Sequence, residues 1–306
     1  MYIPTKPLIG VFTCLAFIQG CSDSSDSPQK ELIDPAIAFA ESAAIEVNKR
    51  QQEAWNNLDA EGEAAVNHYP FIRISGGSLI VFEAYETYRN IVEAISLPNL
   101  VTTEWDHTAW DELEVFQSSP TKVHLSGRFS RINKDGEKYL STETVRIVIK
   151  DQDQWGIKVR STYPLTTPDE INDTGSDEIT VAESAAMEVL QKYILAWNNR
   201  DSTTLSELHH YPSILLQGIN LHRFNTPEDY VSYQENEVFH GLDYAEWDHS
   251  YMNEVEVIKS GIDTVHLAVE CEDINVIGES CGSGEKGIWI ITEVGNEWRI
   301  HARSLF

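Results

Sequence analysis

A histidine two residues after a tryptophan occurs twice in this chain and could perform acid–base chemistry. The tetrapeptide Glu-Trp-Asp-His stands at 104–107 and again at 246–249. A histidine beside a half-buried aromatic ring can donate or accept a proton near neutral pH. In an extended strand, Trp105 and His107 share one face and Asp106 lies on the other. Because tryptophan favours the core, the pattern points His107 inward and Asp106 outward.

Packing alone is the alternative explanation of the repeated tetrapeptide. In that interpretation the tryptophans of both tetrapeptides belong to the core, together with Trp55 and Trp197. His107 and His249 are then hydrogen-bonded histidines beside that core and take part in no chemistry.

A second set of polar residues alternates with apolar ones in the segment Lys-Val-His-Leu-Ser-Gly-Arg-Phe at 122–129. His124 and Arg128 lie on one face of this predicted strand, and the equivalent residues later in the chain are His266 and Glu270. An anion could bind at Arg128 but not at Glu270. The alternative is that this face is solvated or lies between two domains. Arg160 could pair with acids or line a pocket, and the sequence leaves both options open.

Matching residues recur at a constant spacing, which indicates a duplication. An offset of 142 relates Trp-Asn at 55–56 to 197–198, His-Tyr-Pro at 68–70 to 210–212, and Val-His-Leu at 123–125 to 265–267. Near the end the offset is 143 and relates Arg-Ser at 160–161 to 303–304. A repeat of this length is a whole domain, because solenoid repeats span about 20–50 residues. The chain therefore contains two copies of one domain.

Composition and charge narrow the classes of partner. The chain has 306 residues, of which 42% are hydrophobic, as expected for two globular domains. Its 49 acidic and 22 basic side chains give a formal net charge of -27. Such a charge repels phosphate backbones, so nucleic acid is not an expected partner.

The first residues of the chain resemble a bacterial lipoprotein signal. An apolar run from Leu8 to Ile18, too short to span a bilayer, is followed by Gln-Gly-Cys at 19–21. The resemblance implies that Cys21 is lipidated and anchors the chain in the bacterial cell envelope. Ser22 resembles the pattern that sorts lipoproteins to the outer membrane, on its periplasmic face or at the surface. An ordinary secretory signal, with an incidental Cys21, is the alternative.

Two cysteines remain once Cys14 leaves with the signal and Cys21 carries lipid. Cys271 and Cys281 align with Phe129 and Tyr139, which flank a predicted β-hairpin. An exported compartment permits a disulfide between them, which we therefore predict. The alternative is a pair of buried thiols.

Each copy is predicted to begin with helices and to end with strands. Asp34 and Pro35 suit the start of a helix, and apolar residues recur at helical spacing as far as Trp55. A short second helix follows Asp59 and ends at His-Tyr-Pro, and a third runs from about 83 to 95. The segments after it are rich in β-formers. Helices followed by a sheet indicate an α+β fold.

This order of elements resembles the nuclear-transport-factor-2-like superfamily, near its SnoaL-like (polyketide-cyclase-like) and ketosteroid-isomerase-like branches. The residues that carry the resemblance are Ala-Trp-Asn-Asn at the first helix end and the closing strands Trp-Gly-Ile-Lys-Val-Arg-Ser and Trp-Arg-Ile-His-Ala-Arg-Ser. It implies two tandem cone-shaped domains, each with about three N-terminal helices packed on a curved antiparallel sheet. We expect a signal peptide at 1–20, a flexible tether at 21–35, domain one at 36–163, a linker at 164–178 and domain two at 179–306.

The resemblance also implies a pocket at the wide mouth of each cone, and the two domains are expected to pair with each other. We expect a small apolar or aromatic ligand, with no cofactor and no metal. No catalytic residue is assigned, and we expect the pocket to bind its ligand without converting it. The alternatives are an isomerase- or cyclase-type enzyme that uses a pocket histidine, and a structural module of envelope assembly. The pocket candidates are Trp55, Tyr69, Trp105, His107 and His124 in the first copy, and Trp197, Tyr211, Trp247, His249 and His266 in the second.

Overall fold

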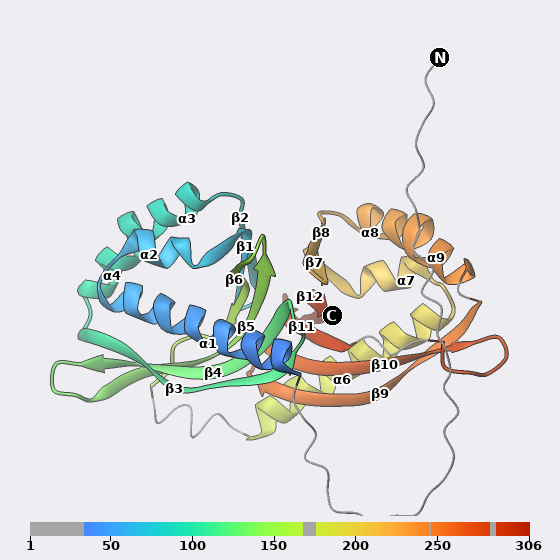
Figure 1. Cartoon of the computed structure of the whole chain (residues 1–306). Helices are drawn as coiled ribbons and strands as arrows, with labels where there is room; N and C mark the ends of the chain where they lie inside the picture. Colours follow the sequence, from blue (N-terminus) through green and yellow to red (C-terminus); the bar gives the residue numbers. More distant parts are fainter. Residues whose placement is uncertain (1–33, 168–175, 245, 282–285) are drawn as a thin grey trace, which may run out of the picture. The chain divides into compact units, whose positions relative to one another are not determined.

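The computed structural model describes residues 34–167, 176–244, 246–281 and 286–306 (Figure 1). We call residues 34–167 the first half and residues 176–306 the second half. The first half consists of α1 (Pro35–Asn56), α2 (Ala60–Ala65), β1 (Asn67–Ser75), β2 (Ser78–Phe82), α3 (Tyr85–Ile91), η1 (Val92–Ser96), α4 (Leu97–Val101), β3 (Trp105–Ser118), β4 (Lys122–Asn133), β5 (Lys138–Asp151) and β6 (Gln154–Thr162).

The second half repeats this order element by element. It consists of α6 (Ser176–Asn198), α7 (Ser202–Glu207), β7 (His209–Gln217), β8 (Asn220–Phe224), α8 (Pro227–Tyr233), η2 (Gln234–Val238), α9 (Phe239–Tyr244), β9 (Trp247–Ser260), β10 (Thr264–Asn275), β11 (Lys286–Val294) and β12 (Glu297–Leu305). The duplicated α+β fold predicted from the sequence is confirmed.

The long first helix forms where its capping residues and apolar spacing predict it. The Asp34 carboxylate accepts a hydrogen bond from the backbone N–H of Ala36 at 2.8 Å, and Pro35 fills the first turn. Ala40, Ala44, Val47 and Ala54 are buried on one face, which packs against the sheet of the first half (Figure 1).

Each half contains one six-stranded sheet with the same topology. The strand orders are β2-β1-β6-β5-β4-β3 and β8-β7-β12-β11-β10-β9. The sheets are mixed, because β1 pairs with β6 in parallel and β7 with β12 in parallel, so the fully antiparallel sheet that we predicted is wrong in this detail. The hairpins β1–β2 and β7–β8 lie between helices, whereas the sequence predicts that the second helix of each copy ends at His-Tyr-Pro. These residues instead begin β1 and β7.

The two sheets pack against each other through one face of each. Apolar residues from both halves form a common buried cluster that includes Ile72, Ile147 and Val159 with Ile214 and Ile290. Because neighbouring residues in a strand point to opposite faces, the residues between them face the helices of their own half. The predicted pairing of the two copies is thus seen as sheet-on-sheet packing.

The predicted linker is partly incorporated into regular structure. Thr166 forms a bridge with Ser141, and α6 already begins at Ser176, so residues 176–178 are helical rather than extended. The predicted signal, Cys21 and the tether lie outside the described residues. No helix in the described part of the chain is long and apolar enough to cross a bilayer.

The disulfide predicted between Cys271 and Cys281 is not formed in the structure. The backbone N–H of Cys281 donates to the carbonyl of Asp273 at 2.9 Å, so Cys281 lies opposite Asp273, two residues beyond Cys271. Diagonal positions on neighbouring strands are about 7–8 Å apart, which exceeds the usual span of a disulfide. Our alignment with Phe129 and Tyr139 misjudged the register, since Phe129 pairs with Thr142.

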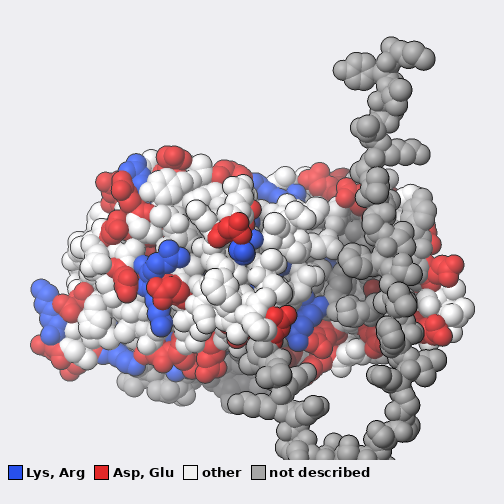
Figure 2. Space-filling view, viewed as in Figure 1, with Lys and Arg blue, Asp and Glu red and all other residues white. Residues whose placement is uncertain are grey.

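Acidic side chains are spread over the outer surface, as the net charge of the chain requires. Figure 2 shows acidic side chains in scattered groups across the visible face, with basic side chains beside several of them. The acidic outer surface therefore contrasts with the interior of the first half, which contains several arginines.

Candidate functional site

The repeated Glu-Trp-Asp-His sequence encodes a β-bulge. Trp105 pairs with Asn133 and His107 pairs with Ile132, so Asp106 is an extra residue on β3. The same irregularity separates Trp247 from His249 on β9. A bulge breaks the alternation of side chains, which is why the predicted inward direction of His107 is wrong. His107 is instead half-exposed, with Nδ1 3.0 Å from Asp106.

An asparagine at the end of the first helix holds the strand just after this bulge. Asn56 donates to the carbonyl of Thr108 at 2.9 Å and accepts from its N–H at 2.8 Å. Asn198 makes the same two contacts with Ser250, each at 2.9 Å. Trp105 Nε1 donates to the Thr108 hydroxyl at 3.0 Å. The repeated Trp-Asn and Glu-Trp-Asp-His segments thus meet in a structural contact.

The histidines of the two Val-His-Leu segments lie between the halves and not in a pocket. Nε2 of His124 is 2.9 Å from the hydroxyl of Ser304, and Nε2 of His266 is 2.7 Å from that of Ser161. Burial, together with the charge of Lys122, lowers the pKa of His124 well below its usual value. Burial also lowers the pKa of His266 to about 3. Both histidines are therefore neutral hydrogen-bonding residues of the interface.

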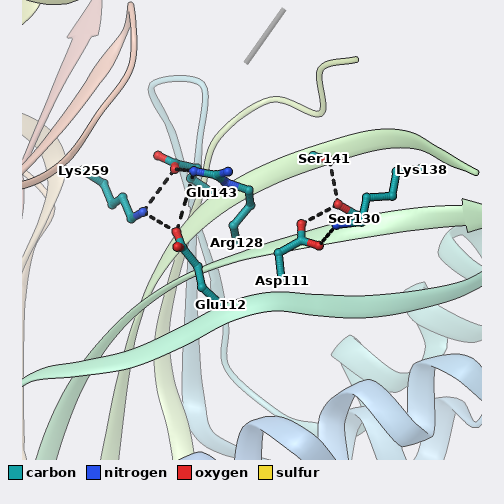
Figure 3. Close-up of polar contacts among 8 residues, drawn as sticks. All are labelled: Asp111, Glu112, Arg128, Ser130, Lys138, Ser141, Glu143 and Lys259. Carbon is teal, nitrogen blue, oxygen red and sulfur yellow. Dashed lines mark hydrogen bonds and ion pairs between the residues drawn. The ribbon is translucent and has the colours of Figure 1, made fainter. Parts of the chain in front are cut away.

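The anion site that we considered at Arg128 is already occupied by carboxylates of the protein. Arg128 lies 3.1 Å from Glu143 and 3.8 Å from Glu112, and Lys259 of the second half contacts the same two acids at 3.1 and 2.8 Å (Figure 3). Hydrogen bonding to Lys259 lowers the pKa of Glu112. In the second half, Glu270 pairs with Lys286. The acid and the base of this ion pair have therefore changed places: Arg128 on β4 pairs with Glu143 on β5, whereas Glu270 on β10 pairs with Lys286 on β11.

A cavity of about 490 Å³ lies between the helices and the sheet of the first half. Its inner end includes the buried residues Gln51, Glu63, Tyr88 and Arg146, and its outer end includes exposed residues such as Thr103. The full lining is Gln51, Gln52, Trp55, Glu63, Arg73, Ser75, Tyr88, Ser96, Asn99, Leu100, Thr103, Thr108, Trp110, Phe129, Arg131, Thr142, Arg146, Arg160, Thr162, Tyr163, Pro164 and Leu165. The lining combines cationic, hydroxyl and aromatic groups, and this volume suits a small organic molecule.

Three arginines stand side by side across neighbouring strands at the inner end. Arg73 on β1 pairs with Arg160 on β6, and Arg160 pairs with Arg146 on β5. Paired residues point to the same face of a sheet, so the three guanidinium groups share the face that lines the cavity. We call Arg73, Arg146 and Arg160 the arginine row. Like charges in directly opposed positions destabilise a sheet. An anion next to this row would therefore stabilise the folded state.

One buried carboxylate offsets part of this charge. Glu63 Oε1 accepts from Gln51 and from the Tyr88 hydroxyl, each at 2.9 Å, and lies 3.3 Å from Arg160. Although burial opposes its charge, Tyr88 and Glu63 raise the pKa of Arg160. Burial raises the pKa of Tyr88 to about 12, so its hydroxyl stays protonated and donates.

The other two arginines of the row, Arg73 and Arg146, form no direct ion pair among the described residues. The charge of Arg160, followed by burial, lowers the pKa of Arg73 to about 10. Burial, followed by the charge of Arg160, lowers the pKa of Arg146 to about 9. Arg146 donates to Asn48 at 3.0 Å and to Gln51, and its guanidinium lies 4.7 Å from the centre of the Trp110 ring. The direct contacts of Arg146 are thus with neutral groups.

The equivalent region of the second half is filled by apolar side chains. Gln51, Glu63, Arg73 and Arg146 correspond to Tyr193, Leu205, Leu215 and Trp289. All four of the latter residues are buried in the core of the second half. Arg303, the counterpart of Arg160, is enclosed between two rings, 4.9 Å from Tyr193 and 4.8 Å from Trp289. The first half therefore has a polar cavity at this place, whereas core side chains occupy the equivalent positions in the second half.

The structure brings only one first-copy pocket candidate to the cavity. Trp55 lines it, whereas Tyr69 donates to the carbonyl of Ala64 at 2.9 Å, and Trp105, His107 and His124 lie elsewhere. In the second copy, Tyr211 donates to Ser206, Trp197 and Trp247 both donate to Ser250, His249 pairs with Asp248, and His266 lies at the interface.

No histidine lines the cavity, so the enzyme alternative based on His107 or His124 has no acid or base there. Among the described residues, no group of histidine, cysteine and acidic side chains is arranged to hold a metal ion. Of these three arginines, only Arg160 is a candidate from the sequence, and Arg73 and Arg146 are not predicted. The signal for all three was a lone arginine next to β-branched residues in a buried strand.

Among the comparisons with known proteins, only the comparison of structures found matches. No family model and no curated protein matches the sequence. Solved structures similar to the chain include an NTF2-like protein of unknown function from Shewanella oneidensis, with 19% identity and a TM-score of 0.32 over 40% of this chain and 98% of the other.

Two further solved structures carry functional names. A ketosteroid isomerase-like protein from Erwinia carotovora atroseptica has 15% identity and a TM-score of 0.33 over 42% of this chain and 96% of the other. The hexachlorocyclohexane dehydrochlorinase LinA-type3 from Novosphingobium barchaimii has 13% identity and a TM-score of 0.34 over 42% and 91%. The observed structure is a tandem α+β fold in which the first half holds a cavity of about 490 Å³.

Proposed function

We propose that the first half binds a small organic anion with an apolar or aromatic body, and that the second half serves as its permanent structural partner. The observation that carries this proposal is the arginine row facing the cavity. Four arginines and a single carboxylate line the cavity, in a chain whose formal net charge is -27. The predicted apolar ligand is thereby revised to an anionic one.

The excess of buried donors favours an anionic ligand over a neutral one. Arg73 makes no ion pair in the described part of the chain, and Arg146 Nε and Trp110 Nε1 are buried there with no hydrogen-bond partner. A carboxylate can accept two parallel hydrogen bonds from a guanidinium, and hydrogen bonds to charged groups contribute about 1.5–3 kcal/mol. Trp55, Trp110 and Phe129 provide apolar walls for the remainder of such a molecule.

A titration of the chain with phenylbutyrate and with its uncharged amide tests this proposal. The two probes have nearly the same shape, so a difference in affinity reports the charge of the carboxylate together with its second acceptor oxygen. We expect the acid to bind at least about tenfold more tightly than the amide, which corresponds to about 1.4 kcal/mol, with one molecule bound per chain. Equal affinity of acid and amide, or two equivalent sites per chain, would contradict the proposal.

The variant Arg73→Gln should remove most of the preference for the acid. Among the described residues Arg73 forms no ion pair and, unlike Arg146, donates to no Asn48 or Gln51 side chain, so its loss disturbs the fold least. The matched control is Lys134→Gln, which removes a positive charge from an exposed hairpin. An unchanged preference in Arg73→Gln would mean that the arginine row does not bind the anion.

We also propose that the chain is a lipoprotein of the bacterial cell envelope, anchored through Cys21. The support is the apolar run from Leu8 to Ile18 followed by Gly20 and Cys21. Cys21→Ser should release the chain from the membrane fraction, while Cys14→Ser should leave it there. A Cys21→Ser protein that still sediments with membranes would refute the anchor.

A further inference from the structure

A fourth arginine lines the cavity far from the arginine row. Arg131 lies on β4 opposite Leu140 of β5, whereas Arg146 lies six residues further along β5. At about 3.3 Å per residue, the two positions are about 20 Å apart along the strand. The cavity therefore has two separate cationic ends.

Arg131 belongs to the mouth of the cavity. It is part-exposed and hydrogen-bonds with Tyr139, whose hydroxyl lies 3.1 Å from that of the exposed Thr103. Thr103, Pro164 and other exposed residues line this end, and no acidic side chain in the described ranges forms an ion pair with Arg131. The row at the inner end, in contrast, contacts the buried residues Gln51, Glu63 and Tyr88.

The middle of the cavity is apolar on the sheet side. Trp110 on β3 pairs with Phe129 on β4, and their rings contact edge to face with centroids 5.6 Å apart. Phe129 is two residues before Arg131, and Arg146 lies beneath the Trp110 ring. These two rings therefore lie between the outer arginine and the inner row.

We propose that the physiological ligand is an elongated dianion, with one acidic group at the arginine row, an apolar body against Trp110 and Phe129, and a second acidic group at Arg131. This inference rests on the proposed anion-binding function and specifies the class of ligand. A compact dianion could satisfy only one end. A long monoanion would leave Arg131 without a counter-charge.

Linear dicarboxylates of increasing length, each compared with the monocarboxylate of equal carbon number, test the inference. We expect affinity to rise with length to an optimum, at which the dicarboxylate binds about tenfold more tightly than its monocarboxylate partner. Arg131→Gln should abolish this preference, so that each dicarboxylate binds no more tightly than its monocarboxylate partner. Arg73→Gln should weaken both classes, and Lys134→Gln should weaken neither.

The outcomes separate this inference from the function on which it rests. Binding of monocarboxylates that depends on Arg73, without any preference for dicarboxylates, would overturn the dianion and keep the anion site. A preference that persists in Arg131→Gln would also overturn it. If neither class binds the parent protein, both the inference and the anion site are wrong.

Discussion

His124 of the first half and Ser304 of the second half are joined by a buried hydrogen bond, with Nε2 and Oγ 2.9 Å apart. The duplicated residues make the reciprocal contact, because His266 lies 2.7 Å from Ser161. A pair of identical contacts exchanged between two copies is the pattern of a twofold dimer interface. The repeated Val-His-Leu and Arg-Ser segments therefore specify how the halves pair, and not a catalytic site.

Acid should weaken the folded state through these interface histidines. The pKa of His266 in the folded state is about 3, below the ordinary value of about 6.5, because burial disfavours its charge. Between these values the unfolded chain binds a proton that the folded chain excludes, so stability is lost as the pH falls from about 6.5 toward 3. Each such histidine contributes a slope of about 1.4 kcal/mol per pH unit.

His266→Gln should therefore reduce the dependence of unfolding free energy on pH in this window, as measured by urea denaturation at several pH values. His107→Gln, which changes an exposed histidine away from the interface, is the matched control. A variant whose pH dependence equals that of the parent would show that His266 does not exclude a proton in the folded state.

Asn56, the last residue of α1, should contribute more to the free energy of unfolding than the neighbouring Asn57. Asn56→Ala removes two hydrogen bonds to the backbone of Thr108 and leaves its N–H without this acceptor, which costs about 1–3 kcal/mol, while its carbonyl still accepts from Gln52 at 2.8 Å. Asn57→Ala, at an exposed position, is the control. Chemical denaturation measures both, and equal small losses would argue against the contact between the helix and the bulged strand.

The sequence predicted the fold well because the fold depends on repeated, local signals. Asp34, Pro35 and the apolar spacing as far as Trp55 were enough to place α1, and the constant offset established the duplication. The hairpin β1–β2 was missed because a proline after His-Tyr resembles a helix end. Pairing with β2 and, through a long-range contact, with β6 makes this segment a strand.

The site was harder to predict because it depends on which face of each strand looks inward. The bulge at Asp106 reversed the expected direction of His107, and nothing local in the sequence marks a bulge there. Arg73, Arg146 and Arg160 are distant in sequence and become neighbours only through the register of three strands. Their lone charges within apolar strands were the signal that could have been used.

Removing the buried carboxylate should make the protein depend on added anions. In Glu63→Gln, Arg160 loses its only carboxylate partner in the described residues while Arg73 and Arg146 remain beside it. Breaking a buried ion pair costs about 3–5 kcal/mol, so the thermal midpoint should fall. Phenylbutyrate should then raise the midpoint of this variant more than that of the parent.

The control for this experiment is Glu61→Gln, in the same helix but exposed, which loses only a surface contact with Arg89. A Glu63→Gln protein as stable as the parent would mean that Glu63 does not offset the charge of the arginine row.

Replacing four cavity residues of the first half by their counterparts from the second half should raise stability and abolish ligand binding. The variant carrying Gln51→Tyr, Glu63→Leu, Arg73→Leu and Arg146→Trp places the core residues Tyr193, Leu205, Leu215 and Trp289 at their equivalent positions. Arg160 is retained, as Arg303 is, and should lie between the new rings. Replacing buried charges by well-packed apolar groups is often stabilising by about 1–4 kcal/mol. We therefore expect a higher urea midpoint together with complete loss of phenylbutyrate binding. A variant that folds, as judged by circular dichroism, and still binds the acid would show that the cavity of the first half is not the anion site.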